Sequence, residues 1–341
     1  MGARASQGRP SLSRGRLGAL AGARPDAAVL LLAGSRAWAF IGGPVTIVLL
    51  SLSLTPAEQG FYYAFASLIA LQSFLELSFS IVVLQFASHE WAHLSLDAHG
   101  RIAGDATARA RLVSIMRLTA RWYAGVALLF AVIVGVAGFL FLDRRAVEVG
   151  GWTGPWAALV LITAGQLALL PFLSIIEGCG FVRAVNAARL AQSVGGSLAI
   201  WGVFLLGGAL WALPASAAVM LAVTLALVFG RFGRFFGPMW RGALEARLHW
   251  RREMWPMQWR LAGSGSVNYL ALSTFVPIVF YFHGPVEAGR TGLTWQMVGA
   301  AAAVSQAWLF PRIPTFGVLV ARRAFEELDR LFFRTTLFTV G

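Results

Sequence analysis

The stretch Trp152–Ile176, WTGPWAALVLITAGQLALLPFLSII, contains 25 residues and no charged side chain. At about 1.5 Å per residue, a helix of this length crosses the ~30 Å hydrocarbon core of a bilayer. Seven other apolar stretches share this character: Val29–Leu54, Gly60–Phe86, Trp122–Leu142, Ser193–Leu213, Pro214–Gly230, Leu261–Phe282 and Gly292–Phe310. The sequence therefore predicts an all-α polytopic membrane protein with about eight transmembrane helices.

Arginine is unevenly distributed among the segments that join these spans. The chain has no lysine, so all 28 of its basic residues other than histidine are arginines. If the N-terminus is cytoplasmic, 25 of the 28 fall on the cytoplasmic side, and only Arg144, Arg145 and Arg290 fall outside. Positively charged residues are retained in the cytoplasm during insertion. The pattern therefore predicts a multi-pass protein of the bacterial inner membrane with its N-terminus in the cytoplasm.

The composition narrows the class of protein further. Hydrophobic residues make up 58% of the chain and charged residues 13%. The formal charge of +13 is also found in nucleic-acid-binding proteins. Here, however, the arginines flank apolar spans, where they contact anionic lipid headgroups. We therefore expect membrane lipids rather than nucleic acid as partners. The single cysteine, Cys179, excludes an intramolecular disulfide and a cysteine-based metal cluster.

A short motif occurs twice, before the second and the eighth predicted spans. Pro56–Gly60 and Pro285–Gly289 both read P-x-E-x-G, and 229 positions separate them. Many transporters consist of two such repeats with the substrate bound between them. We therefore predict four regions, with the second lobe incomplete: a basic cytoplasmic tail (1–28), a six-helix N-terminal lobe (29–230), a basic cytoplasmic linker (231–260) and the first part of a C-terminal lobe (261–341).

The repeat also leads to an expectation about the end of the chain. Residues 321–335 place apolar side chains on one face, which is typical of a helix lying in the cytoplasmic interface. Arg334–Phe338 then resembles the beginning of a ninth span. A complete second lobe would need about four more helices, so we expect the chain to be a C-terminally truncated fragment.

Three segments resemble a known family. They are Leu54–Tyr63 (LTPAEQGFYY), Leu71–Leu77 (LQSFLEL) and Gln85–Glu90 (QFASHE). They are similar to polysaccharide-exporting flippases of the multidrug/oligosaccharidyl-lipid/polysaccharide exporter superfamily, which includes O-antigen and lipid II flippases. The resemblance implies two lobes around a central cavity and transport by alternating access, without enzymatic activity or a cofactor. It also implies undecaprenyl-pyrophosphate-linked oligosaccharide as the substrate, with a polysaccharide polymerase or glycosyltransferases as further partners.

Such a substrate requires cations for its pyrophosphate, and amides and hydroxyls for its sugars. Arginine suits phosphate because its planar guanidinium donates paired hydrogen bonds. Charged residues inside spans are costly and are therefore candidates for function. In the first lobe, we expect Arg36 to pair with Glu76 and to face the cavity. Gln72, Glu76 and Ser80 recur every four residues as a polar stripe. The second lobe offers Arg260, Asn268 and Gln296 as substrate-binding candidates.

Each candidate also has a structural explanation. An Arg36–Glu76 pair can simply lock the first two spans together, and the stripe can hydrogen-bond neighbouring helices at ~1 kcal/mol each. Arg260 stands at the cytoplasmic boundary and can reach lipid phosphates. The alternative function is a cation-coupled multidrug exporter of the same superfamily. Such an exporter needs an intramembrane acid, for which Glu76 is the deep candidate.

One motif points to a different class of protein. His89–His93 matches H-E-x-x-H, in which two histidines one helical turn apart bind zinc and the glutamate acts as a base. His99 follows at the spacing of a third ligand. However, leucine occupies position 96, where the turn toward that ligand needs glycine. A soluble protease-sized domain is also missing from the sequence pattern. We therefore expect no metal, and a membrane-embedded zinc peptidase is the least favoured function.

Overall fold

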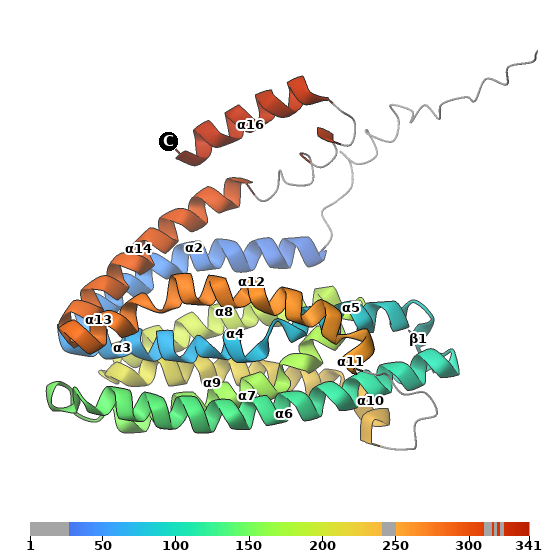
Figure 1. Cartoon of the computed structure of the whole chain (residues 1–341), viewed down its shortest axis with the longest axis horizontal. Helices are drawn as coiled ribbons and strands as arrows, with labels where there is room; N and C mark the ends of the chain where they lie inside the picture. Colours follow the sequence, from blue (N-terminus) through green and yellow to red (C-terminus); the bar gives the residue numbers. More distant parts are fainter. Residues whose placement is uncertain (1–26, 241–249, 310–315, 317–318, 321–323, 341) are drawn as a thin grey trace, which may run out of the picture.

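The computed structural model describes residues 27–240, 250–309, 316, 319–320 and 324–340 (Figure 1). Most of these residues are helical, and the main helices run along one common direction. The first group of helices is α2 (Ala27–Ser53), α3 (Pro56–Ile69), α4 (Leu71–Glu76), α5 (Phe79–Trp91), α6 (Ala106–Asp143), α7 (Thr153–Gly178), α8 (Val182–Leu205) and α9 (Ala212–Leu225). A π-helical turn, Ala226–Arg231, continues α9.

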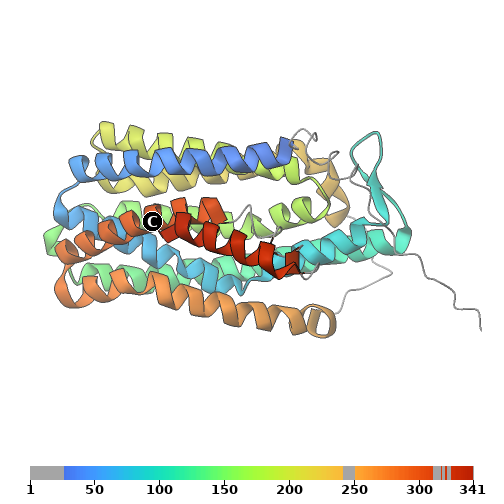
Figure 2. The same ribbon diagram turned by 90° about the horizontal axis from the view of Figure 1, so that it is seen from above.

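The second group is α10 (Gly233–Phe236), α11 (Trp250–Glu253), α12 (Trp255–Ser273), α13 (Phe275–His283), α14 (Pro285–Leu309) and α16 (Phe325–Val340). Two short strands, β1 (Leu94–Leu96) and β2 (Ile102–Gly104), form an antiparallel hairpin between α5 and α6. Figure 2 shows α2 and α12 on opposite sides of the view from above, with α16 lying between them.

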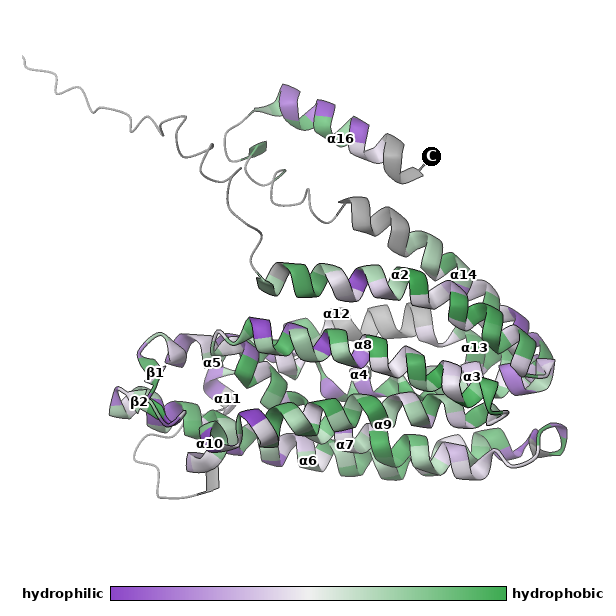
Figure 3. Cartoon of the chain, turned by 180° about the vertical axis from the view of Figure 1, so that it is seen from behind, coloured by the Kyte–Doolittle hydropathy of each residue, from purple (hydrophilic) through white to green (hydrophobic). Residues whose placement is uncertain are grey.

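Four helical segments among the described residues are long and apolar enough to cross a membrane: Leu30–Ser53, Ala106–Asp143, Thr153–Gly178 and Ala209–Arg231. A fifth results if Pro56–Glu76 and Phe79–Trp91, which meet at a bend of 45°, form one span. The fold is thus that of an all-α membrane protein. In Figure 3, hydrophobic residues, drawn in green, occur along most of the long helices. By this criterion the described residues provide fewer than the eight predicted spans. The three predicted spans that correspond to α8, to α12 with α13, and to α14 are not among them.

The two ends of the bundle differ in their number of arginines. One end contains the starts of α2 and α8, joined where Asn186 Nδ2 donates a hydrogen bond to the Ala28 carbonyl, together with the β-hairpin, α10 and α11. We call it the arginine-rich end; its arginines include Arg101, Arg109, Arg183 and Arg231. The other end contains the starts of α3 and α14 and the loop after α6. We call it the arginine-poor end. Which of the two ends faces the cytoplasm stays a prediction from the arginine distribution.

Small residues allow the helices of the bundle to pack closely. On α2, Gly34 lies against Leu190 and Gly42 against Ser197, both on α8. The same face carries Thr46, whose hydroxyl accepts a 2.9 Å hydrogen bond from the Trp201 indole. Glycine at such positions brings helix backbones together, which replaces the hydrophobic driving force that is absent in lipid. The face of α2 that points away from α8 includes Arg36.

Two predicted spans differ from the observed helices. The fifth was expected at Ser193–Leu213, but α8 begins at Val182. The polar residues of its first three turns, among them Arg183 and Arg189, had indicated a loop. The second predicted span is broken at Leu77 and Ser78, which have φ angles of 53° and 54°. Two consecutive left-handed residues other than glycine end α4 and turn the chain into α5.

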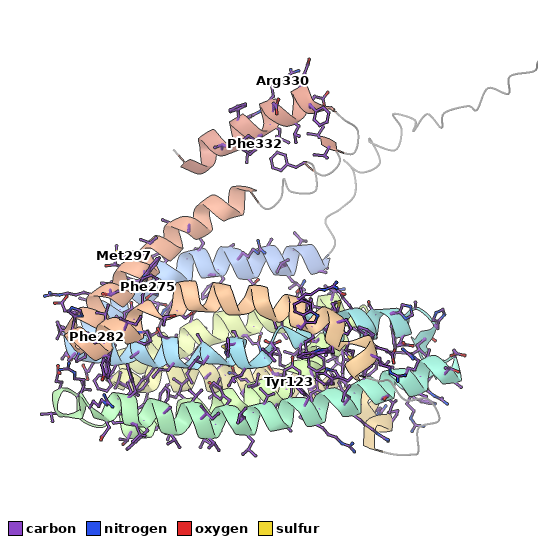
Figure 4. The ribbon with its side chains drawn as sticks, in the orientation of Figure 1. Tyr123, Phe275, Phe282, Met297, Arg330 and Phe332 are labelled. Carbon is purple, nitrogen blue, oxygen red and sulfur yellow. The ribbon has the colours of Figure 1, made fainter. Side chains whose placement is uncertain are left out.

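The last described helix is amphipathic. Phe325, Phe332 and Phe333 on α16 are exposed, and Arg330 and Phe332 lie on opposite sides of the helix (Figure 4). The chain forms one helix from Phe325 to Val340 instead of an interfacial segment followed by a new span at Arg334. Residues 321–323 of the predicted interfacial segment lie outside the described part.

Candidate functional site

The two copies of the P-x-E-x-G motif pack against each other at the arginine-poor end. Each begins a helix, α3 at Pro56 and α14 at Pro285. A methyl group on Gly60 would overlap the carbonyl oxygen of Pro285, and one on Gly289 would lie 2.9 Å from the carbonyl oxygen of Pro56. These helix starts can therefore approach as closely as they do only because glycine occupies both positions.

The contact is reciprocal. Pro56 and Pro285 are equivalent in the repeat, as are Gly60 and Gly289, and each glycine contacts the proline of the other copy. Gly292, the equivalent of Tyr63, lies directly against the Tyr63 ring. Such an exchange of partners is the property of a contact around a two-fold axis. The repeated motif is therefore a packing motif, and its two copies form one site, which we call the motif pair.

Side chains extend the motif pair in both directions. Toward the middle of the bundle, the Tyr63 hydroxyl donates a 2.5 Å hydrogen bond to Oε1 of Gln296 on α14. Toward the end, Phe61 packs on Phe280 of α13 with ring centroids 5.2 Å apart. Arg144, after α6, donates a 2.8 Å hydrogen bond to the Tyr281 hydroxyl. Aromatic and polar contacts thus hold α13 and α14 against the earlier helices at the arginine-poor end.

A second polar feature lies at the break between α4 and α5. Glu76 is the last residue of α4, and its Oε1 accepts a 3.1 Å hydrogen bond from the Ser80 backbone N–H and a 3.2 Å bond from the Tyr123 hydroxyl. Tyr123 is fully buried on α6 (Figure 4). The first N–H groups of a helix have no partner within the helix, and leaving them unpaired in a membrane is costly. Glu76 therefore supplies an acceptor for a backbone N–H group in the first turn of α5, after the break in the span.

The contribution of the hydrogen bond between Tyr123 and Glu76 to stability can be measured by substitution. Tyr123→Phe removes a donor to a carboxylate in an interior site, for which we expect a loss of about 1.5 kcal/mol of unfolding free energy. Tyr281→Phe makes the same chemical change at an exposed ring and should cost less than half as much. Chemical denaturation of the purified protein in detergent measures both. Equal stability of Tyr123→Phe and the unmodified protein would contradict the assigned role of Glu76.

The structure does not gather the predicted substrate-binding residues into one site. Glu76 and Arg36 form no ion pair in the described chain, because Glu76 is directed to Tyr123 and Ser80 while Arg36 is exposed on α2. The predicted pair of these two residues was wrong. Gln72 is half-buried on α4, and Arg260 is exposed, with its guanidinium 5.8 Å from the Trp259 ring centroid.

Of the two remaining candidates, Gln296 belongs to the motif pair through Tyr63. Asn268 lies on α12, and its side chain is outside the described part of the structure. Among the five candidates whose side chains are described, no two are joined by a hydrogen bond or an ion pair. The sequence did not single out Tyr63 and Tyr123, because an aromatic residue in an apolar run gives no sign that its hydroxyl has a polar partner.

The H-E-x-x-H segment has a structural role. Glu90 is buried, and its Oε1 lies 2.8 Å from Nε of Arg111 on α6. Arg111 also binds Glu253 of α11 through Nη2, at 2.7 Å. The His89 side chain is 79% exposed, and the described residues contain no group of three or more potential metal ligands. A buried carboxylate that is paired with arginine is not available as the base of a peptidase.

Comparison with family models, with curated proteins and with solved structures finds no match to this chain. The class that the fold defines is a helical membrane protein with an internal, reciprocally packed motif. Any more specific function rests on the residues themselves.

Proposed function

We propose that this protein translocates a lipid-linked oligosaccharide across the bacterial inner membrane by alternating access. The observation that carries the proposal is the motif pair. It joins two copies of one sequence motif at one end of the bundle, and transporters built from repeats move their halves about such contacts. The arginine-poor end would be the closed, outer end in this conformation, and the headgroup would enter from the arginine-rich, cytoplasmic end.

Two exposed arginines along the bundle suit the pyrophosphate of a lipid-linked oligosaccharide. Arg36 and Arg260 are exposed cations on α2 and α12. Guanidinium groups at these positions suit a pyrophosphate, since they remain charged and donate paired hydrogen bonds. No bond of the substrate is broken, so the proposal requires neither a cofactor nor a catalytic residue.

The test is the lipid-linked oligosaccharide content of a strain that lacks this gene. We expect one such species to accumulate on the cytoplasmic leaflet and a plasmid copy of the gene to reverse the accumulation. A plasmid encoding Arg36→Gln should reverse it less well. Normal levels of every lipid-linked oligosaccharide in the deletion strain would refute the proposal.

One observation favours the cation-coupled multidrug exporter as the second candidate. Glu76 is a half-buried carboxylate within the bent span, with a buried tyrosine as its partner. An exporter that couples to a cation requires such a group to bind and release the ion. If Glu76→Gln abolished resistance to cationic drugs while protein levels stayed normal, this second function would replace the first. In a flippase, the same change should reduce stability and leave drug sensitivity unaltered.

A further inference from the structure

A pocket of about 400 Å³ with polar and apolar lining residues lies among α5, α7, α8 and α9, away from the motif pair. Its volume falls within the range of small-molecule binding sites. Seven polar side chains help to line it: Ser80, Gln166, Ser174, Glu177, Arg189, Gln192 and Thr224.

The two glutamines are held in fixed positions by helix α9. Gln166 Nε2 donates a 2.7 Å hydrogen bond to the Ala217 carbonyl. Gln192 Nε2 donates to the Met220 carbonyl at 3.1 Å and to the Thr224 hydroxyl at 2.9 Å. Neither amide oxygen has a hydrogen-bond donor among the described residues. The pocket therefore contains two fixed acceptors that suit ligand hydroxyl groups.

The charges of the pocket balance each other. Arg189 binds Glu177 in a bidentate pair, with Nη2–Oε2 at 2.6 Å and Nη1–Oε1 at 3.1 Å. Nη1 also donates a 3.3 Å bond to Oδ1 of Asn186. A cation would be repelled by the arginine and a phosphate by the glutamate, whereas a neutral polar molecule can use the remaining donors and acceptors of both. Among the described residues, the lining contains none of the aromatic rings that attract organic cations.

We propose that this pocket binds a neutral sugar unit. The assignment of the natural ligand as a sugar of the oligosaccharide headgroup rests on the proposed function. The ability of the pocket to bind a neutral sugar is argued from its lining residues alone. The glutamine oxygens accept hydrogen bonds from sugar hydroxyls, and the Arg189–Glu177 pair supplies one donor group and one acceptor group. The phosphates of the same substrate would bind elsewhere, at the exposed arginines of α2 and α12.

The experiment uses the full chain in lipid nanodiscs, because maltoside detergents carry sugar headgroups that would occupy the pocket. The only natural cysteine, Cys179, is buried and is replaced by alanine. A new cysteine at Met220, which lines the pocket and is 38% exposed, reports access through its rate of reaction with a maleimide. Leu225→Cys is the matched control, since it lies on the same helix, is 39% exposed and does not line the pocket.

We expect maltose to slow the labelling of Met220→Cys several-fold and to leave Leu225→Cys unchanged. Adding Gln192→Met should weaken this protection about fivefold, the factor typical of one lost hydrogen bond. Adding Gln85→Met, which changes an exposed glutamine outside the pocket, should not weaken it. Protection by a lipophilic cation or by inorganic phosphate in place of maltose would overturn the proposal, as would equal protection of both cysteines or of neither. Because the measurement needs no transport, it remains decisive whichever result the deletion strain gives.

Discussion

Replacing Gly60 with alanine should destabilise the protein by about 3 kcal/mol. The new methyl group would overlap the backbone carbonyl of Pro285, which cannot move aside as a flexible side chain can. The helix starts must then separate, or α14 must shift, and such overpacking typically costs 1–3 kcal/mol or somewhat more. The shift is roughly 2–4 °C per kcal/mol for chains of 150–250 residues and smaller for longer ones, so the melting temperature should fall by about 6 °C.

A control for this substitution lies on the partner helix. Gly299, also on α14, has open space where its methyl group would be. Gly299→Ala should therefore be neutral, or stabilising by up to ~1 kcal/mol through the higher helix propensity of alanine. A thermal melt of both variants in the same detergent makes the comparison. If Gly60→Ala melted together with Gly299→Ala, the close packing of the motif pair would be disproved. Under the proposed function, Gly60→Ala should also reduce transport, because the outer end could no longer close.

Arg111→Met should have the other large effect. Glu90 has a side chain that is only 5% exposed, and Arg111 is its close cationic partner. Removing one member of a buried ion pair leaves an uncompensated charge, which costs about 3–5 kcal/mol. The change also releases Glu253, so α11 loses its ion pair with α6. We expect a large decrease in unfolding free energy by chemical denaturation.

Two further variants identify the cause of this decrease. Arg109→Met removes an exposed arginine two positions away and should cost less than ~1 kcal/mol. Arg111→Met combined with Glu90→Met removes both charges, and similar replacements of buried pairs are often neutral. The double variant should therefore be more stable than Arg111→Met alone. If it is less stable, the stranded charge of Glu90 is not the source of the loss.

The length of an apolar stretch predicted a helix reliably where charged residues lie close to both ends of the stretch. The stretch Trp152–Ile176 was predicted as a span and is observed as α7, Thr153–Gly178. The start of α6 was missed, because the charged residues after Ala106 resemble a loop; Asp105 begins the helix there by accepting a hydrogen bond from the Ala108 N–H. The break at Leu77 was also missed, since neither Leu77 nor Ser78 is a residue that favours a left-handed backbone.

The sites were harder to predict than the helices. The motif repeat indicated that two segments are equivalent, but equivalence along the chain does not imply contact, and the packing of Gly60 on Pro285 depends on the tertiary fold. The expected Arg36–Glu76 pair was derived from similar depth in neighbouring spans. It failed because the carboxylate of Glu76 instead accepts hydrogen bonds from the Ser80 N–H, after the bend, and from the Tyr123 hydroxyl. Arg189 was assigned to a loop, so its pocket could not be anticipated.

The reciprocal packing of the motif pair has an evolutionary consequence. A surface whose two halves exchange equivalent contacts is self-complementary, and the same contact can form between two identical molecules. Because α3 and α14 both begin at the arginine-poor end, a two-fold axis relating them would run along the bundle rather than across it (Figure 1). An ancestor containing one copy of the motif could therefore have met a second copy of itself in this way before gene fusion joined them. Glycine at positions 60 and 289 would then be a remnant of an ancient homodimer.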